Sequence, residues 1–220
     1  ARHRHVRGRI ALVTGDITVQ GLAVPAKVAR DLRRSLAEAY HLAAVYDLAV
    51  RRDVGRLVNV EGTKNVLEFL DKAPRFERLH YVSTAYVSGT ARGTFRETDL
   101  DVGQGFKNHY EETKFQAEVE VERSQVPRTI YRPGIVVGDS KTGETGKFDG
   151  PYFVLRVMEK LPSPGVFVRI GLGFGTVNIV PIDFVVEALA SLSASPASAG
   201  KTYHLCDPDP HSPGELVELF

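Results

Sequence analysis

Residues 79–83 read Leu-His-Tyr-Val-Ser, an apolar run that is typical of a buried parallel strand and that leads directly into Thr84. The Tyr110–Val121 stretch follows, with the side chains of one helix face at the i, i+4, i+7 and i+11 spacing. A second apolar run comes next, over Thr129–Arg132. This order of strand, helix and strand predicts a parallel sheet with helices packed on it.

The rest of the chain repeats this alternation. Further strands are expected at Ile10–Thr14, Tyr40–Ala44 and Tyr203–Cys206. Further helices are expected after Pro25, over Val60–Leu70 ending before Pro74, and over Phe184–Leu192 with Asp183 as the cap. The predicted fold class is therefore α/β, a doubly wound, open parallel sheet of the Rossmann type, with ligands at the carboxyl ends of the strands.

One domain is predicted over residues 1–220, because no linker of low complexity divides the chain. The segment 138–182 departs from the alternation, since it is rich in Gly and Pro and has one short helical pattern at Phe153–Lys160. We expect the elements on the substrate side to lie mainly in 138–182 and 207–220.

Composition limits the possible partners. With 28 Lys and Arg against 27 Asp and Glu, the net charge of +1 provides no bulk field that would attract nucleic acid. No apolar stretch of about 18 residues predicts a membrane span. The single cysteine, Cys206, cannot form an intrachain disulfide, which fits a cytoplasmic location. No set of residues at usual metal-ligand spacing appears, so no metal is predicted.

The strongest chemical pattern is the pair Tyr110 and Lys114. Four residues apart on a helix, the two side chains lie on one face, where an ammonium group favours the phenolate and lowers the pKa of the tyrosine. Tyr110 would then donate and accept a proton near neutral pH. Thr84, at the end of a strand, could hydrogen-bond a substrate carbonyl as negative charge builds on its oxygen.

Together these segments resemble the extended short-chain dehydrogenase/reductases. The resemblance is carried by motifs that match in order and spacing over most of the chain: His41–Asp47, Asn59–Thr63, Tyr81–Ala85, Tyr110–Lys114 and Tyr131–Gly138. Within that superfamily, Asn108–Glu118 and Gly15–Thr18 look most like the acyl-thioester reductase branch. That branch holds the male-sterility-like fatty acyl-CoA reductases and the reductase domains of carboxylic acid reductases and peptide synthetases.

The resemblance implies a role for each matching position. Tyr110 would be the acid, Lys114 would lower its pKa and bind the nicotinamide ribose, and Thr84 would polarise the carbonyl, with Ser83 as the alternative holder of that role. Asn59 would support a proton-relay water, unless it is simply a satisfied polar group at the start of a helix. The cofactor contacts that the resemblance implies, or else core packing for the apolar ones, are Asp16, Ile17, Ala43, Ala44, Pro133 and Ile135.

The family's glycine-rich turn, which seats the pyrophosphate on a helix N-terminus, is not found among the 20 glycines of the sequence. If Ile10–Thr14 is the family's third strand, the sequence is expected to be truncated at its N-terminus, and this piece alone is expected to bind the cofactor poorly. Without that region the sequence does not decide between NAD and NADP, and the resemblance favours NADPH.

The activity that the resemblance implies is reduction of an acyl thioester, on coenzyme A or on a carrier, to an aldehyde by hydride transfer. An alternative is a nucleotide-sugar epimerase or dehydratase, or an alcohol dehydrogenase, since the same residues serve many substrates in this superfamily. Another is a non-catalytic dinucleotide-binding scaffold or sensor. The partner is expected to be a small-molecule or carrier-bound acyl substrate, and the oligomeric state stays open.

Overall fold

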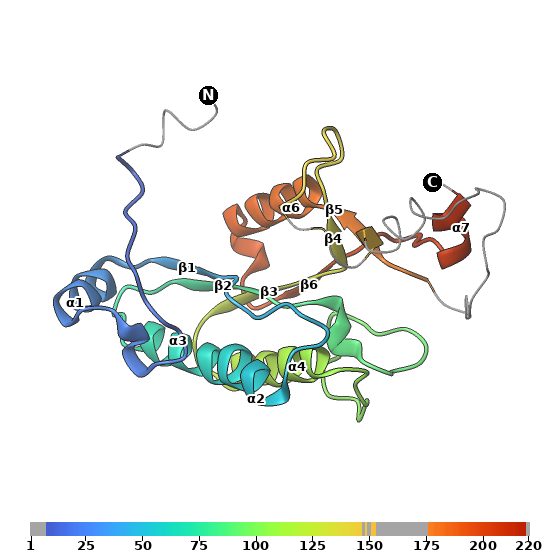
Figure 1. The fold of residues 1–220 in the computed structure, drawn as a ribbon. Coiled ribbons are helices and arrows are strands. Elements are labelled where there is room, and N and C mark those ends of the chain that lie inside the picture. The colour runs from blue at the N-terminus through green and yellow to red at the C-terminus, as the bar shows by residue number, and fades with distance from the viewer. Residues whose placement is uncertain (1–7, 147, 149–150, 153–175, 219–220) are drawn as a thin grey trace. The chain divides into compact units, whose positions relative to one another are not determined.

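The computed structural model describes residues 8–146, 148, 151–152 and 176–218, and Figure 1 shows their order along the chain. The elements are η2 (Gln20–Ala23), α1 (Ala26–Ser35), β1 (Glu38–His41), α2 (Arg52–Gly55), η3 (Arg56–Glu61), α3 (Gly62–Asp71), β2 (Arg78–Val82), η4 (Ala85–Ser88), α4 (His109–Arg123), β3 (Arg128–Pro133), β4 (Ile135–Val137), β5 (Ile179–Pro181), α6 (Ile182–Ala194), η5 (Pro196–Ser198), β6 (Thr202–Leu205) and α7 (Pro213–Glu218). The contacts divide the chain into two compact units.

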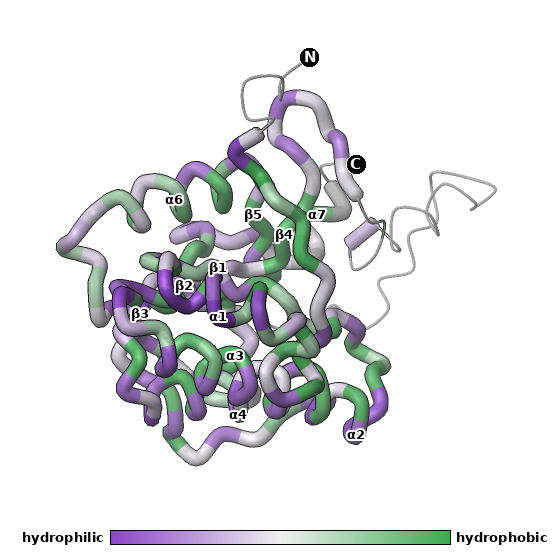
Figure 2. The backbone as a smooth tube through the Cα atoms, turned by 90° about the vertical axis from the view of Figure 1, so that its left-hand side faces the viewer, coloured by the Kyte–Doolittle hydropathy of each residue, from purple (hydrophilic) through white to green (hydrophobic). Residues whose placement is uncertain are grey.

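Unit 1 comprises Ala1–Tyr81 and Val87–Thr129. Within it β1 and β2 pair in parallel, in a register that runs from Glu38 opposite Arg78 to His41 opposite Tyr81. Helices α2, α3 and α4 lie together on one side of these strands, and both views agree on this arrangement (Figures 1 and 2). Along these helices hydrophobic and hydrophilic stretches alternate, as expected for helices with one buried face (Figure 2).

The core of unit 1 is formed by the apolar faces of α3 and α4 and by β2. Its buried side chains include Val60, Leu67, Leu70, Leu79, Ala117 and Val121. Between α2 and α3 the chain makes one turn of π-helix, η3, in which Asn59 and Val60 are buried. A π-helical turn inside a longer helix is rare and is often found at functional sites.

Unit 2 comprises Val82–Tyr86 and Ile130–Phe220. Within it β3 and β6 pair in parallel from Ile130 opposite Thr202 to Pro133 opposite Leu205, and β4 pairs in parallel with β5. Its core is built around Tyr131, Val180, Val185 and Leu205, with partly buried residues of α6 packed against them.

Most of the predicted elements are confirmed, with ends shifted by a few residues. The strands predicted at Leu79–Ser83, Thr129–Arg132 and Tyr203–Cys206 correspond to β2, β3 and β6. The strand predicted at Tyr40–Ala44 is realised as β1 and ends three residues earlier, at His41. The predicted helix at Phe153–Lys160 lies outside the described residues.

Two predictions are wrong. Ile10–Thr14 forms no strand, and Ile10 and Leu12 are 75% and 96% exposed, because an apolar segment becomes a strand only beside a neighbour that pairs with it. Asp183 does not cap α6: Pro181 holds that position, and the Asp183 carboxylate instead accepts hydrogen bonds from the Ser140 amide at 3.0 Å and the Ser140 hydroxyl at 2.6 Å. In the part of the chain that is described, no helix has the length and apolarity that a membrane crossing requires.

Candidate active site

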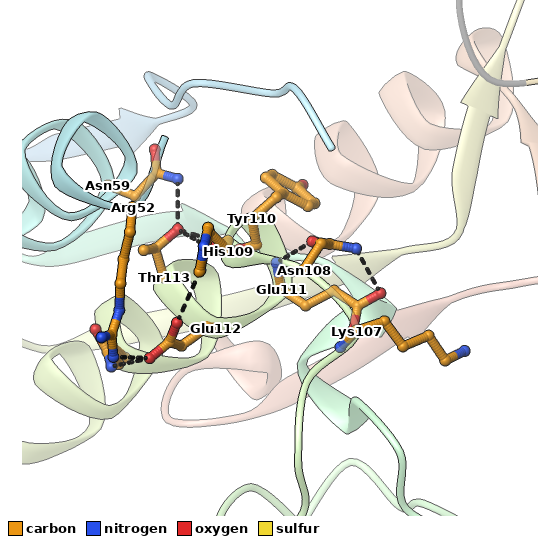
Figure 3. Close-up of polar contacts among 10 residues, drawn as sticks. Arg52, Asn59, Lys107, Asn108, His109, Tyr110, Glu111, Glu112 and Thr113 are labelled. Atoms are coloured by element: carbon orange, nitrogen blue, oxygen red, sulfur yellow. Dashed lines mark hydrogen bonds and ion pairs between the residues drawn. The ribbon is translucent and has the colours of Figure 1, made fainter. Parts of the chain in front are cut away.

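Helix α4 carries Tyr110 and Lys114, the pair that the sequence singled out. The helix begins at His109 because the Asn108 side chain caps it, accepting a hydrogen bond from the Glu111 amide at 2.9 Å. The Glu111 carboxylate in turn accepts hydrogen bonds from the Lys107 amide at 3.0 Å and the Asn108 side-chain amide at 3.1 Å. This reciprocal cap, drawn in Figure 3, fixes the first turn and therefore the place of Tyr110.

Tyr110 is buried at the start of this helix, with 6% of its surface exposed. Its ring meets the ring of Tyr46 edge-on, with centroids 5.1 Å apart and planes at 90°. Tyr46 belongs to the segment that follows β1, so this segment lies against the N-terminal end of α4, where Tyr110 is located.

Lys114, one turn further along α4, is also buried, at 4% exposure. Its ammonium donates to the Tyr81 hydroxyl at 3.4 Å and lies 4.8 Å from the centre of the Tyr81 ring. Burial lowers the pKa of Lys114 to about 8, and the Glu118 carboxylate opposes this change. A lysine with such a pKa is still mostly protonated at neutral pH and provides a positive charge in a dry environment.

Asn59, on the π-helical turn η3, connects α4 to the segment after β1. Its side-chain oxygen accepts a hydrogen bond from the Val45 amide at 2.8 Å, and its amide group donates to the Thr113 hydroxyl at 3.0 Å. Thr113 in turn donates to the His109 carbonyl at 2.7 Å (Figure 3). The prediction that Asn59 supports a relay water is not tested by these contacts, which give its side chain protein partners.

Ser83 and Thr84 belong to unit 2 and follow directly after β2. Both are buried. The Ser83 amide donates to the Tyr131 carbonyl at 2.7 Å, and the Thr84 hydroxyl accepts from the Tyr86 amide at 3.3 Å. In the same unit, Pro133 is buried at the end of β3, and Ile135 is partly buried at the start of β4.

The predicted cofactor residues of unit 1 have two different environments. Ala43 and Ala44 are exposed in the segment after β1. Asp16 lies in a turn, where its carboxylate accepts from the Thr18 amide at 2.8 Å. The Ile17 side chain faces helix α3, since a Cβ added to Gly62 would lie 2.9 Å from its Cδ1.

The donors of unit 1 fit part of a dinucleotide. The Lys114 ammonium and the Tyr110 phenol are donors suited to ribose hydroxyls, and Tyr46 brings the exposed Ala43–Ala44 backbone segment to the same end of α4. Residues 8–146, 148, 151–152 and 176–218 contain no cluster of three or more His, Cys, Asp or Glu side chains that could hold a metal ion.

Several residues of the site were not singled out from the sequence for any role. Tyr81 bonds Lys114 across 33 positions of sequence, and Tyr46 and Thr113 are likewise brought in by tertiary packing. One signal could have found the cap: Asn108 followed three residues later by Glu111 is a common pattern at the start of a helix.

Comparisons with known proteins identify the family of the chain. A family model described as male sterility protein matches residues 1–189. Fatty acyl-CoA reductase wat of Drosophila melanogaster is 27% identical over 210 residues, which are 83% of this chain and 41% of that protein. The non-canonical nonribosomal peptide synthetase cpsA of Aspergillus campestris is 30% identical over 226 residues, covering 96% of this chain and 21% of that protein.

Among solved structures, the terminal R domain from the myxalamid PKS-NRPS biosynthetic pathway is similar, with a TM-score of 0.84 and 30% identity. The match covers 97% of this chain and 54% of that chain, and it confirms the predicted α/β fold with a parallel sheet of the Rossmann type. This chain thus spans less than half the length of each of the two curated relatives described above. On the family match and on these relatives, the chain belongs to the male sterility protein family of NAD-binding domains, among the extended short-chain dehydrogenase/reductases.

Proposed function

We propose that the full-length protein reduces an acyl thioester to an aldehyde, taking its hydride from NADPH. The observation that carries the proposal is the pair on α4: a buried phenol, Tyr110, and a buried ammonium, Lys114, four residues apart on one helix. Fatty acyl-CoA reductase wat and the myxalamid R domain are the relatives that favour a thioester over other carbonyl substrates. The carrier of the acyl group, coenzyme A or a carrier protein, belongs to the proposal as well.

Each proposed role follows from the chemistry of the side chain. When bound, NADPH supplies the hydride that reduces the thioester carbonyl carbon. Tyr110 donates its phenolic proton to the carbonyl oxygen, and the adjacent ammonium of Lys114 stabilises the phenolate that remains. Thr84, with Ser83 as the alternative, donates a hydrogen bond to the same oxygen as its negative charge develops. The Tyr110 phenolate then takes the proton back from the hydroxyl of the resulting hemithioacetal, the carbon–sulfur bond breaks, and the thiolate leaves and gains a proton from solvent as the aldehyde forms.

Binding roles are proposed for the remaining residues. Lys114 and Tyr110 would hold the nicotinamide ribose, and Ala43 and Ala44 would lie under the cofactor backbone. Asp16 and Ile17 would lie near the adenine, and Pro133 and Ile135 near the nicotinamide. Asn59 would keep the segment at Val45 against α4, which steadies the place where Tyr46 meets Tyr110.

The test is turnover of a panel of acyl-CoA and carrier-bound thioesters by the full-length protein, with NADPH consumption and free-thiol release measured together. One thiol released per NADPH oxidised is the expected result. Replacing Tyr110 with Phe removes the acid and should lower kcat by about 10²–10⁴-fold. The control is Tyr40→Phe, which removes a phenol hydroxyl from a half-exposed side chain on β1.

Unchanged turnover in Tyr110→Phe would refute the assignment of the acid. Epimerisation of a nucleotide sugar without net cofactor consumption would refute thioester reduction and support the epimerase alternative. Cofactor binding with no turnover of any carbonyl compound would instead support the non-catalytic alternative.

A further inference from the structure

A chain of polar side chains lies buried behind Lys114 in unit 1. It runs from His41 on β1 through Thr63 on α3 to Tyr81 on β2, whose hydroxyl is hydrogen-bonded to the Thr63 side chain and also accepts the hydrogen bond from Lys114 at 3.4 Å. All four side chains are more than nine-tenths buried. Buried polar groups are costly unless they are hydrogen-bonded, so a chain of this kind constrains the positions of its members.

The direction of the hydrogen bonds follows from Thr63. Its hydroxyl donates to the Asn59 carbonyl at 2.7 Å, so its proton is already used. His41 Nε2, 3.1 Å from the same oxygen, must therefore be the donor, which assigns the tautomer from the network. Burial, and secondarily the charge of Lys114, lowers the pKa of His41 to about 4, so its ring is neutral at neutral pH.

We propose that Tyr81 is a positioning residue of the active site, which holds the Lys114 ammonium through its phenol oxygen and is itself held by the ring of His41 and by the buried polar chain at Thr63. The two rings are packed at a tilt, with centroids 5.6 Å apart. The inference rests on the proposed function, since it matters for catalysis only if Lys114 acts there.

The charged and titratable groups around Lys114 decide the expected direction of change. They include Tyr81 on β2, His41 on β1, and Tyr110 and Glu118 on α4. Burial, and then the Glu118 carboxylate, raises the pKa of Tyr81 far above its usual range, so its phenol stays protonated and neutral. A neutral oxygen that accepts a hydrogen bond from the ammonium favours the charged lysine. Removing that oxygen lowers the pKa of Lys114 further.

The experiment compares full-length wild type with Tyr81→Phe, which keeps the ring and removes the oxygen. The titration of Lys114 is followed by NMR of isotope-labelled lysine side chains, assigned with Lys114→Met. The expected result is a downward shift of the Lys114 midpoint by about one pH unit, with the alkaline limb of kcat/KM moving the same way. Tyr40→Phe, which removes a hydroxyl from the neighbouring strand, should leave both unchanged.

A folded Tyr81→Phe protein with the wild-type Lys114 midpoint would overturn the proposal. If Tyr81→Phe does not fold, the pair Thr63→Val and Thr63→Ser replaces it: loss of the hydroxyl should shift the Lys114 midpoint, and serine, which keeps a hydroxyl, should restore it. Equal midpoints in both variants would also overturn the proposal. Since the titration needs no turnover, a shifted midpoint in a protein that reduces no thioester would refute the proposed function and leave the role of Tyr81 standing.

Discussion

Lys114 is a charged group in a place that disfavours charge. The sequence predicts its pairing with Tyr110 because both residues belong to one helix, where the spacing alone fixes their common face. It could not predict the contact of Lys114 with the Tyr81 hydroxyl, since that contact depends on how a strand 33 positions away packs against α4. Local periodicity therefore predicts the Tyr110–Lys114 pair, and tertiary packing supplies the groups that surround it.

Burial of Lys114 has a measurable cost in stability. Because the pKa of Lys114 is about 8 in the folded chain and 10.5 ordinarily, the unfolded state binds more protons between these values, and the free energy of unfolding rises with pH from about 8 toward 10. Above pH 10 the raised pKa of Tyr81 reverses the trend, since the folded state then keeps a proton that the unfolded state loses.

We expect Lys114→Met to remove the rise in the free energy of unfolding between pH 8 and 10, because the group that titrates there is gone. Urea unfolding at a series of pH values measures this directly. The control is the exposed Lys201→Met, which should keep the wild-type pH dependence. A Lys114→Met chain that still gains stability between pH 8 and 10 would show that another group causes the rise.

At the scale of the element, the start of α4 is fixed by its own sequence. Asn108 and Glu111 satisfy each other's polar groups and the free amides of the first turn. The side chains of His109 and Glu112 lie one turn apart on the same helix, and Glu112 also accepts from Arg52 of α2 at 2.6 Å (Figure 3). That ion pair is largely exposed on its Arg52 side, so it contributes little to stability.

Replacing Asn108 with Ala should therefore lower the free energy of unfolding by about 1 kcal/mol, and by up to about 2 because the Glu111 carboxylate loses a donor as well. Denaturant unfolding of the two proteins is the measurement. Gln116→Ala, further along the same helix, changes a partly buried side chain with a single long hydrogen bond and should have a smaller effect. Equal losses in both variants would argue against the cap as the cause.

At the scale of the whole molecule, the alternation of strands and helices made the fold class predictable. The two wrong predictions concern features that depend on contacts with residues distant in the sequence. The apolar pattern of Ile10–Thr14 is as typical of a strand as that of β2. Only β2 has a neighbouring strand that pairs with it in the described structure. The helix cap expected at Asp183 failed because Ser140, 43 residues away, takes both of its oxygens. The sequence shows which side chains can pair or form hydrogen bonds, but their partners are determined by the tertiary structure.

The exposed apolar side chains of unit 1 give a prediction for the chain as a whole. The apolar side chains of Leu12 and Leu42 are 96% and 60% exposed. Replacing the two together with Glu should reduce the fluorescence of bound ANS while changing the free energy of unfolding by less than about 0.5 kcal/mol, because neither side chain is packed. Val102→Glu, at a separate exposed position, is the control and should reduce the fluorescence less.

The π-helical turn η3 also sets the angular phase between α2 and α3. A π-helical turn closes its hydrogen bonds one residue later than an α-helical turn. It therefore accommodates one extra residue while the helices on either side keep their alignment. On α2, Gly55 lies where an added Cβ would touch Thr113 at 3.4 Å, and Arg52 reaches Glu112. Deleting a single residue from Arg56–Val58 should therefore let the turn relax to α-helix while α2 keeps its phase relative to α3. The contacts of Arg52 and Gly55 with α4 should then survive the deletion together, whereas a deletion within α3 would have no such turn to absorb it.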